Sequence, residues 1–311
     1  MILITGGLGY LGARIAKYLL DRGNKVRVAT SRQNAFIPKE LVGSEIVKID
    51  LSAQKTLEVA CDGVSIIIHL AGMDAKSCEK NPEQAILVNS LGTLNLLKAA
   101  KKSNIDRFIY FSTAHVYGKP LEGSFTEDTL PHPSHPYSIT HRTAEDYVYE
   151  YSMAGHFSAV IFRLSNAVGC PISKDINCWM LVSNDLVRQL IINKKLQIYS
   201  NVYSERDFIA ISDVCNAVNF MLKYDQLNHC EIYNLGSGCA LNLKNLSELI
   251  CDEAEKIIDR RPVVEFLHGS NNKSIHKLNY SVDKINGIGC HIGTNLNKEI
   301  KQLILMSQKW F

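Results

Sequence analysis

The chain has no Cys-x-x-Cys pair, no excess of either charge and no long apolar run. Nine irregularly spaced cysteines among 311 residues disfavour a disulfide framework or zinc ribbon and favour reduced thiols in the cytoplasm. Lysine and arginine number 34 against 31 acidic residues, and the net charge of +3 gives no reason to expect nucleic acid or an anionic membrane as partner. The apolar stretch at 64–73 is interrupted and too short to span a bilayer.

Two further signals are missing. No basic segment precedes the strand-like residues 2–4, which predicts that no signal peptide is present. His132 and His135 lie in a proline-bounded loop without a Cys, His or Asp cluster to complete a site, so no metal site is predicted. The 46% of hydrophobic residues and 21% of charged residues are typical of a globular protein that buries a sizeable core.

Short apolar segments alternate with amphipathic ones in the first half of the chain. The expected strands are 2–4, 25–29, 45–49, 65–69, 107–111 and 158–162, and the expected helices are 13–22, 82–102 and 136–154. This alternation predicts an α/β fold with a Rossmann-type, doubly wound parallel sheet. After residue 166 the pattern loosens. We therefore predict a cofactor domain of 1–166 and 206–238, and a smaller substrate-binding lobe of 167–205 and 239–311.

A glycine-rich segment joins the first expected strand to the first helix. It reads Ile4-Thr5-Gly6-Gly7-Leu8-Gly9-Tyr10-Leu11-Gly12, with glycines spaced G-x-x-G-x-x-G. Gly6 allows a tight turn, Gly9 lets the backbone approach a pyrophosphate, and Gly12 lets the helix pack close to the strand. Amide groups at the helix N-terminus favour the phosphate charge. The segment therefore predicts a dinucleotide site.

Seven further motifs follow the glycine loop along the chain: Asp50-Leu51, His69-Leu70-Ala71-Gly72, Asn89-Ser90-Leu91-Gly92-Thr93, Phe111-Ser112-Thr113-Ala114-His115-Val116-Tyr117-Gly118, Arg163-Leu164-Ser165-Asn166-Ala167-Val168-Gly169, Arg206-Asp207-Phe208-Ile209 with Asp213-Val214, and Tyr233-Asn234-Leu235-Gly236-Ser237-Gly238. Together with the loop they resemble the extended short-chain dehydrogenase/reductases, the NAD-dependent epimerase/dehydratases of sugar nucleotides. The resemblance covers essentially the whole chain. It implies cofactor contacts from Gly6, Gly9, Tyr10, Leu11, Gly12, Asp50, Leu51, Leu70, Ala71, Gly72, Asn89, Tyr137 and His141.

The end of the second strand bears on the choice between NAD and NADP. In dinucleotide folds an acidic residue there binds the ribose 2′-hydroxyl. Here the residues are Thr30, Ser31 and Arg32, whose hydroxyls and guanidinium suit a 2′-phosphate. We expect NADP more than NAD, while Arg32 as a solvated loop residue leaves NAD open.

The family resemblance also implies a catalytic tyrosine, a lysine four residues later and a hydroxyl partner. Tyr137 and Thr113 match the tyrosine and the hydroxyl partner, but His141 occupies the lysine position. Three interpretations stand: His141 substitutes for the lysine, the protein binds cofactor but turns over poorly, or a cation from elsewhere compensates. A substitute acting as a cation near its unperturbed pKa of about 6.5 predicts a narrow, bell-shaped pH profile.

The remaining motif residues concern the substrate. Ala114 and His115 occupy the positions of the acid pair in the family's dehydratases, which disfavours 4,6-dehydratase activity. Arg206 and Asn166 resemble residues that contact the diphosphate of a nucleotide-diphosphate sugar, and an arginine fork suits phosphate oxygens. Thr113 is expected to contact the substrate as well.

These expectations give one leading function and two others. The leading one is an NAD(P)-dependent sugar-nucleotide epimerase or 4-ketoreductase/dehydrogenase acting at C4 in surface-glycan precursor synthesis. A regulatory or low-activity relative with a degraded site is the alternative, and an enzyme of sterol or flavonoid ketones is disfavoured by Arg206. The helices at 82–102 and 136–154 resemble the family's dimer helices, so we expect a cytoplasmic homodimer.

Overall fold

The computed structural model describes residues 1–199, 201–227, 229–267, 277–293 and 295–311, and they divide into two compact units. The first unit comprises Met1–Lys119, Glu127–Leu164 and Val218–Asn234, and the second comprises Pro120–Thr126, Ser165–Ala217 and Leu235–Phe311. These units carry Tyr137 and Arg206, respectively. The cofactor and substrate domain boundaries drawn from the sequence stay a prediction.

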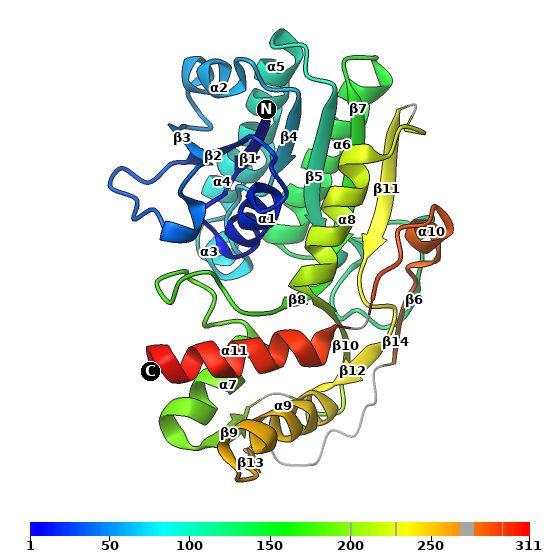
Figure 1. The fold of residues 1–311 in the computed structure, drawn as a ribbon. Coiled ribbons are helices and arrows are strands. Elements are labelled where there is room, and N and C mark those ends of the chain that lie inside the picture. The colour runs from blue at the N-terminus through cyan, green and yellow to red at the C-terminus, as the bar shows by residue number, and fades with distance from the viewer. Residues whose placement is uncertain (200, 228, 268–276, 294) are drawn as a thin grey trace. The chain divides into compact units, whose positions relative to one another are not determined.

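A seven-stranded sheet in the order β11-β7-β5-β4-β1-β2-β3 organises the first unit (Figure 1). Its strands are β1 (Ile2–Thr5), β2 (Val26–Thr30), β3 (Glu45–Lys48), β4 (Ile66–His69), β5 (Arg107–Thr113), β7 (Ser158–Leu164) and β11 (Cys230–Leu235). The strands from β3 through β7 pair in parallel. This confirms the predicted Rossmann-type α/β fold. The strand order reverses beside β1, where folds of this kind bind ligands at the carboxyl ends of the strands.

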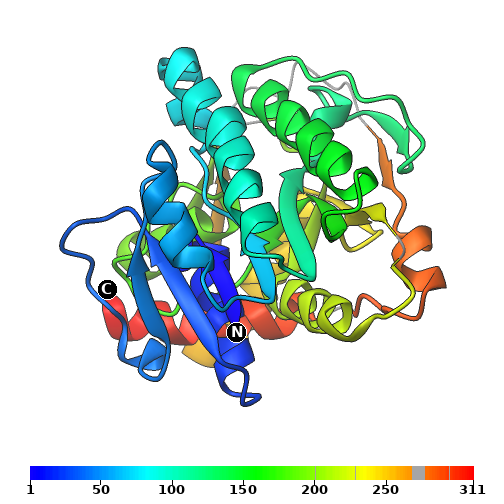
Figure 2. The ribbon, with the colours of Figure 1, turned by 90° about the horizontal axis from the view of Figure 1, so that it is seen from above.

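Helices cover both faces of this sheet. Helix α1 (Tyr10–Leu20) packs on one face, while α2 (Gln54–Cys61), α5 (Gly92–Lys102) and α6 (Pro136–Met153) pack on the other, where α5 and α6 lie side by side (Figure 2). Strand residues Leu3, Ile67 and Phe108 point into the core beneath the second helical layer. The alternation of buried side chains along each strand thus serves two apolar layers.

The predicted helix at 82–102 is interrupted in its hydrogen bonding. It consists of α4 (Pro82–Ala85), the π-helical segment η2 (Ile86–Leu91) and α5. The π-helical turn carries Asn89 and Ser90, both buried. Single π-helical turns inside α-helices occur frequently at functional sites. Short elements that were not predicted from the sequence include α2, η1 (Lys39–Leu41), α3 (Ala75–Lys80) and η3 (Ala114–Tyr117).

A buried ion pair joins α6 to β7. Glu145 and Arg163 are each 1% exposed, and their Oε2 and Nη2 atoms lie 2.8 Å apart. Arg163 also donates to the Tyr117 hydroxyl, which in turn donates to the Asn234 amide oxygen. Every charge in this network has a partner, as burial requires. Arg163 of the R-x-x-N motif therefore serves the packing of the first unit.

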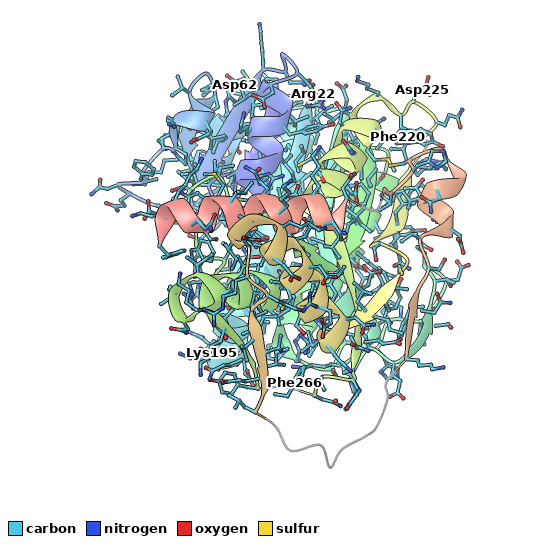
Figure 3. All side chains as sticks on the ribbon, turned by 60° about the horizontal axis from the view of Figure 1, so that its bottom comes forward. Arg22, Asp62, Lys195, Phe220, Asp225 and Phe266 are labelled. Atoms are coloured by element: carbon cyan, nitrogen blue, oxygen red, sulfur yellow. The ribbon has the colours of Figure 1, made fainter. Side chains whose placement is uncertain are left out.

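Within the described residues, the second unit contains three small sheets, three long helices and one short helix. Its strands are β6 (Gly123–Phe125), β8 (Asn166–Val168), β9 (Lys195–Ile198), β10 (Glu205–Ala210), β12 (Ala240–Asn242), β13 (Val263–Phe266) and β14 (Leu278–Tyr280), and its helices are α7 (Val182–Asn193), α9 (Leu243–Ile258), α10 (Asp283–Gly287) and α11 (Leu296–Trp310). Helix α8 (Ile211–Lys223) begins here and ends in the first unit. Figure 3 labels Lys195 and Phe266, which mark the paired strands β9 and β13. In the described parts of the chain, no helix is long and apolar enough to cross a membrane.

Candidate active site

A cavity of about 240 Å³ lies at the carboxyl ends of β1, β2 and β4, where the strand order reverses. Its lining comes from four loops of the first unit: Gly6, Leu8, Gly9, Ala29, Thr30, Ser31, Arg32, Ile49, Leu51, Leu70, Ala71 and Gly72. The set includes most of the residues expected to contact a cofactor. It contains no carboxylate, so the cavity suits an anionic ligand.

The glycine loop has no room for larger residues. Gly6 has φ +66°, and a Cβ at Gly12 would lie 2.3 Å from the Gly6 carbonyl oxygen. A Cβ at Gly7, which the sequence analysis did not single out, would lie 2.8 Å from Val28 Cγ1. Gly9 caps α1 without a side chain, and the first turn holds no acidic residue. The loop and helix end are therefore a cradle for a pyrophosphate, as dinucleotide binding needs.

Tyr10 and Leu11 begin α1, next to this cradle. Their contact with a cofactor stays a prediction, because neither lines the cavity described above. Asp50 also lies outside that lining: its Oδ1 accepts hydrogen bonds from the Ser52 amide and hydroxyl, and these lower the pKa of Asp50. Its expected contact with adenine stays a prediction, whereas its neighbour Leu51 does line the cavity.

A buried histidine holds the loop after β4 against the end of β1. The Thr5 hydroxyl lies 2.6 Å from His69 Nδ1 and accepts hydrogen bonds from the Leu70 and Ala71 amides. On the other side, His69 Nε2 lies 2.9 Å from the Thr93 hydroxyl, which itself donates to the Asn89 carbonyl. Because the Thr93 proton is used, His69 must donate from Nε2 and accept at Nδ1. Burial lowers its pKa to about 3, so it is neutral.

Asn89 connects the cofactor loop to the helix that carries Tyr137. Its Oδ1 accepts from the Met73 amide, and its Nδ2 donates to the Thr140 hydroxyl at 3.1 Å and to Cys78 Sγ. Thr140 in turn donates to the backbone carbonyls of the preceding turn of α6. The amide is thus engaged within the protein, and a direct contact of Asn89 with the cofactor stays a prediction.

The proposed 2′-phosphate residues lie together at the end of β2. The Thr30 hydroxyl accepts from the Arg32 amide at 3.2 Å, which makes a short turn. Thr30 is buried, while Ser31 and Arg32 are exposed, and all three line the cavity. The geometry therefore places two hydroxyls and one guanidinium at the cavity wall.

Tyr137 lies in the first turn of α6, which begins at Pro136 after the His135 cap. A hydrogen bond with Thr113, at the end of β5, lowers the pKa of the phenol. Burial raises the pKa more than this hydrogen bond lowers it. Together with the nearby Cys78 and Asp74, burial raises the pKa of Tyr137 to about 12. Among the described residues, none of the groups that shift this pKa is a cation. The structure therefore brings together the predicted tyrosine and hydroxyl partner, with the phenol protonated at neutral pH.

His141 lies one turn after Tyr137, with the two ring centroids 4.4 Å apart in an edge-to-face arrangement. Burial, with His115 and His135 nearby, lowers the pKa of His141 to about 4. This shift disfavours the interpretation in which His141 acts as an imidazolium titrating near 6.5, because desolvation disfavours the charged ring. Its Nδ1 lies 2.7 Å from the Tyr110 hydroxyl. His141 can act here as a neutral hydrogen-bonding group.

Two of the residues expected to contact substrate, Arg206 and Asn166, lie in the second unit, whereas Thr113 lies in the first. Arg206 on β10 is half-buried, its partial desolvation lowers its pKa, and among the described residues no acidic side chain pairs with it. Asn166 on β8 donates to the Asp207 carbonyl at 2.8 Å. Asp207 is buried and accepts from Ser165 and Ser237, so it orders the loops around β10. An unpaired, desolvated guanidinium suits an anionic ligand.

The model of the NAD dependent epimerase/dehydratase family matches residues 2–236. The chain belongs to this family of enzymes. Its cavity, glycine cradle and Tyr137–Thr113 pair all lie within the matched range. In the described part of this family member, no group of three or more His, Cys, Asp or Glu side chains could hold a metal ion.

Several curated relatives of this family member are named as enzymes of nucleotide sugars or as proteins of glycan synthesis. It is 27% identical to low-salt glycan biosynthesis protein Agl12 of Haloferax volcanii, covering 91% of this chain and 89% of the relative. It is 25% identical to a putative UDP-glucose 4-epimerase of Methanocaldococcus jannaschii, covering 98% and 97%. The UDP-glucose 4-epimerase structure from Thermotoga maritima superposes with a TM-score of 0.84 at 20% identity, covering 99% of each chain.

Several residues that hold the side chains of this site in place were not predicted from the sequence. Thr5, Thr93 and Thr140 complete the hydrogen bonds of His69 and Asn89, and Tyr110 holds His141. Strand alternation could have placed Tyr110 and Phe108 on the same face of β5. Nothing in the local pattern shows which helix residue meets them.

Proposed function

We propose that this family member is an NAD(P)-dependent epimerase or 4-ketoreductase/dehydrogenase acting at C4 of a nucleotide-diphosphate sugar, with Tyr137 as the proton carrier. One observation carries the proposal: Tyr137 and Thr113 meet in the same unit that holds the glycine cradle and its cavity. A nicotinamide cofactor supplies hydride transfer when bound. The surrounding residues must then bind the substrate oxygen and move one proton.

Tyr137 and Thr113 have different roles in binding the substrate oxygen and moving the proton. Tyr137 exchanges a proton with the C4 oxygen, and Thr113 hydrogen-bonds the same oxygen. Because the Tyr137 pKa is about 12, the phenol holds its proton at neutral pH and is ready to donate to a ketone. This protonation state favours 4-ketoreduction as the productive direction. Elimination of water is disfavoured, since Ala114 and His115 provide no acid pair.

Arg206 is the proposed diphosphate-binding residue. Its guanidinium is desolvated without a carboxylate partner among the described residues, and a diphosphate would supply the missing charge. Asn166 supports it by tying β8 to β10, besides its proposed substrate contact. An Arg206→Gln variant should bind nucleotide sugars at least tenfold more weakly and retain its affinity for NAD(P), as measured by calorimetry. Equal affinity in both proteins would reject the assignment.

NADP is the proposed cofactor over NAD, because Ser31 and Arg32 line the cavity where a carboxylate would repel a 2′-phosphate. Arg32→Asp should reverse the ratio of the NADP and NAD dissociation constants, while the Arg22→Asp control, just beyond the C-terminal end of α1, should leave it unchanged. An unchanged ratio in the Arg32 variant would favour NAD as the natural cofactor. Solved relatives such as the UDP-glucuronic acid 4-epimerase of Bacillus cereus hold NAD.

A binding protein with low activity is the second candidate. It is favoured by the neutral His141, because no cation then lowers the Tyr137 pKa as a lysine would. Mass spectrometry of ligands that copurify with the protein would identify nucleotide and sugar directly. Assays with UDP-, GDP- and dTDP-linked 4-keto and 4-hydroxy sugars then separate the candidates: the enzyme turns over at least one of them, while the binding protein holds the cofactor without turnover. The name of the Haloferax relative supports a role in surface-glycan precursor synthesis.

A homodimer is the proposed assembly. Apolar side chains on the neighbouring helices η2 and α6 are exposed in the single chain: Leu87, Leu91, Ile139 and Tyr147. Leu87→Glu should give a monomer by light scattering at micromolar concentration, whereas Val59→Glu on α2, a position at least as exposed, should not. A wild-type monomer at that concentration would refute the proposal.

A further inference from the structure

Tyr110 is a buried phenol on β5 whose hydroxyl faces His141 on α6. Its Oη lies 2.7 Å from His141 Nδ1, and the two residues are 2% and 8% exposed. The Tyr110 ring packs among Phe108, Ala144 and Val148 in the core of the first unit. The hydroxyl therefore has a fixed position, and its proton must find an acceptor inside the protein.

Neighbouring groups leave His141 as that acceptor. The His69 ring lies 5.6 Å from the Tyr110 ring, but both of its nitrogens are engaged by Thr5 and Thr93. Among the described residues, Tyr110 has no hydrogen-bond partner besides His141. Burial and the nearby Glu145 hold the pKa of Tyr110 well above its usual value, so the phenol keeps its proton.

Two proton arrangements are possible for this pair, and they differ in cost. If His141 carried its proton on Nδ1 and donated to Tyr110, the Tyr110 proton would be left without an acceptor in the apolar core. If Tyr110 donates to Nδ1, both atoms are satisfied and the imidazole proton lies on Nε2. A buried donor left without an acceptor destabilises the protein, and this cost favours the second arrangement.

We propose that Tyr110 is a positioning residue that holds His141 as the Nε2–H tautomer, making it a neutral hydrogen-bond donor in the active site. His141 Nε2 has no partner within the described residues, although the ring edge lies beside Tyr137. The acceptor for this donor is a hydroxyl oxygen of the nicotinamide ribose, an assignment that rests on the proposed function. His141 thereby replaces the hydrogen bond of a lysine without replacing its charge.

Nuclear magnetic resonance on protein without cofactor tests the tautomer directly. Isotope-labelled histidine and proton–nitrogen correlation spectra, with His141→Gln used for assignment, should show protonated Nε2 and unprotonated Nδ1 at His141. Tyr110→Phe keeps the packed ring but removes the donor, so the His141 nitrogen signals should move toward a mixture of tautomers. Tyr149→Phe, at an exposed position of α6, should leave them unchanged. A proton on Nδ1 in the wild type, or no change in Tyr110→Phe, would overturn the proposal.

Cofactor titration tests the consequence. Tyr110→Phe should weaken NAD(P) binding about three- to tenfold, as expected for one misdirected neutral hydrogen bond, and should have no further effect in a His141→Ala background. Equal losses in both backgrounds would mean that Tyr110 acts through the core rather than through His141. A wild type that binds neither NAD nor NADP would refute the proposed function, while the tautomer spectra would still decide the role of Tyr110.

Discussion

The rings of Tyr137 and His141 lie 4.4 Å apart, edge to face, and both are uncharged at neutral pH. Burial raises the pKa of the phenol to about 12 and lowers that of the imidazole to about 4, so the two shifts move apart. A cationic neighbour would instead lower the pKa of the tyrosine. The Tyr137 phenol therefore holds its proton at neutral pH, and His141 supplies no positive charge that would favour the release of this proton.

Restoring the cation should raise activity. In a His141→Lys variant the ammonium lowers the pKa of Tyr137, and we expect about tenfold faster oxidation of a 4-hydroxy sugar. His141→Gln keeps a neutral donor without the charge and serves as the matched control. Steady-state kinetics with both variants measure the difference. A lysine variant no faster than the glutamine variant would show that charge at this position does not limit turnover.

The pH dependence should differ between the two reaction directions. Oxidation needs the tyrosinate, so its kcat/KM should rise about tenfold per pH unit from neutrality toward the pKa of about 12. Reduction needs the protonated phenol, so its kcat/KM should stay flat over the same range. His141 is deprotonated above its pKa of about 4 and should add no step between pH 6 and 8. A bell-shaped oxidation profile centred near pH 6.5 would instead show a titrating His141.

The glycine cradle can be tested without turnover. Gly12→Ala places a Cβ 2.3 Å from the Gly6 carbonyl oxygen, so the loop or the helix must shift. We expect NAD(P) binding to weaken at least tenfold, or about 1.4 kcal/mol, by fluorescence titration. Gly287→Ala, with no atom near its added Cβ, should bind as the wild type does. Unchanged binding in Gly12→Ala would exclude this loop as the pyrophosphate site.

The buried ion pair behind α6 should dominate the stability of the first unit. Glu145→Gln leaves the buried Arg163 guanidinium without its carboxylate and should cost about 3–5 kcal/mol of unfolding free energy. Asp146 forms an ion pair with Arg142, but its side chain is 60% exposed. Asp146→Asn should therefore cost less than about 1 kcal/mol of unfolding free energy. Denaturant unfolding of the two variants gives the comparison. Equal costs would contradict the role of burial.

The sheet and the glycine loop could be predicted from the sequence because each has a local cause. Three consecutive isoleucines at 66–68 indicate a strand covered on both faces, and the Gly6–Gly12 spacing marks a strand-to-helix turn. The helix at 82–102 was expected as one element, because side-chain periodicity does not reveal the π-helical turn at Ile86–Leu91. Its bulge becomes visible only in the backbone hydrogen bonds.

The charge state of the site depends on tertiary packing and could not be predicted. Thr113, Tyr137 and His141 were located by their motifs, but the sequence shows neither the burial that neutralises His141 nor the contact from Tyr110. Tyr110 lies 31 residues before His141 in the sequence and contacts it only because β5 packs against α6. Likewise, the motif around Asn89 implies a cofactor contact, but the side-chain amide of Asn89 forms hydrogen bonds with Met73, Thr140 and Cys78.

Tyr137 as proton carrier is the central claim, and one assay tests it most directly. Wild-type protein and Tyr137→Phe are each incubated with NADPH or NADH and a panel of nucleotide-linked 4-keto sugars, and the loss of reduced nicotinamide absorbance is followed. The variant keeps the ring and its packing, so cofactor affinity should be unchanged. We predict turnover in the wild type and at least a hundredfold loss in Tyr137→Phe, within the about 10²–10⁴-fold contribution of a positioned acid or base. Wild-type turnover that persists undiminished in Tyr137→Phe would contradict the account.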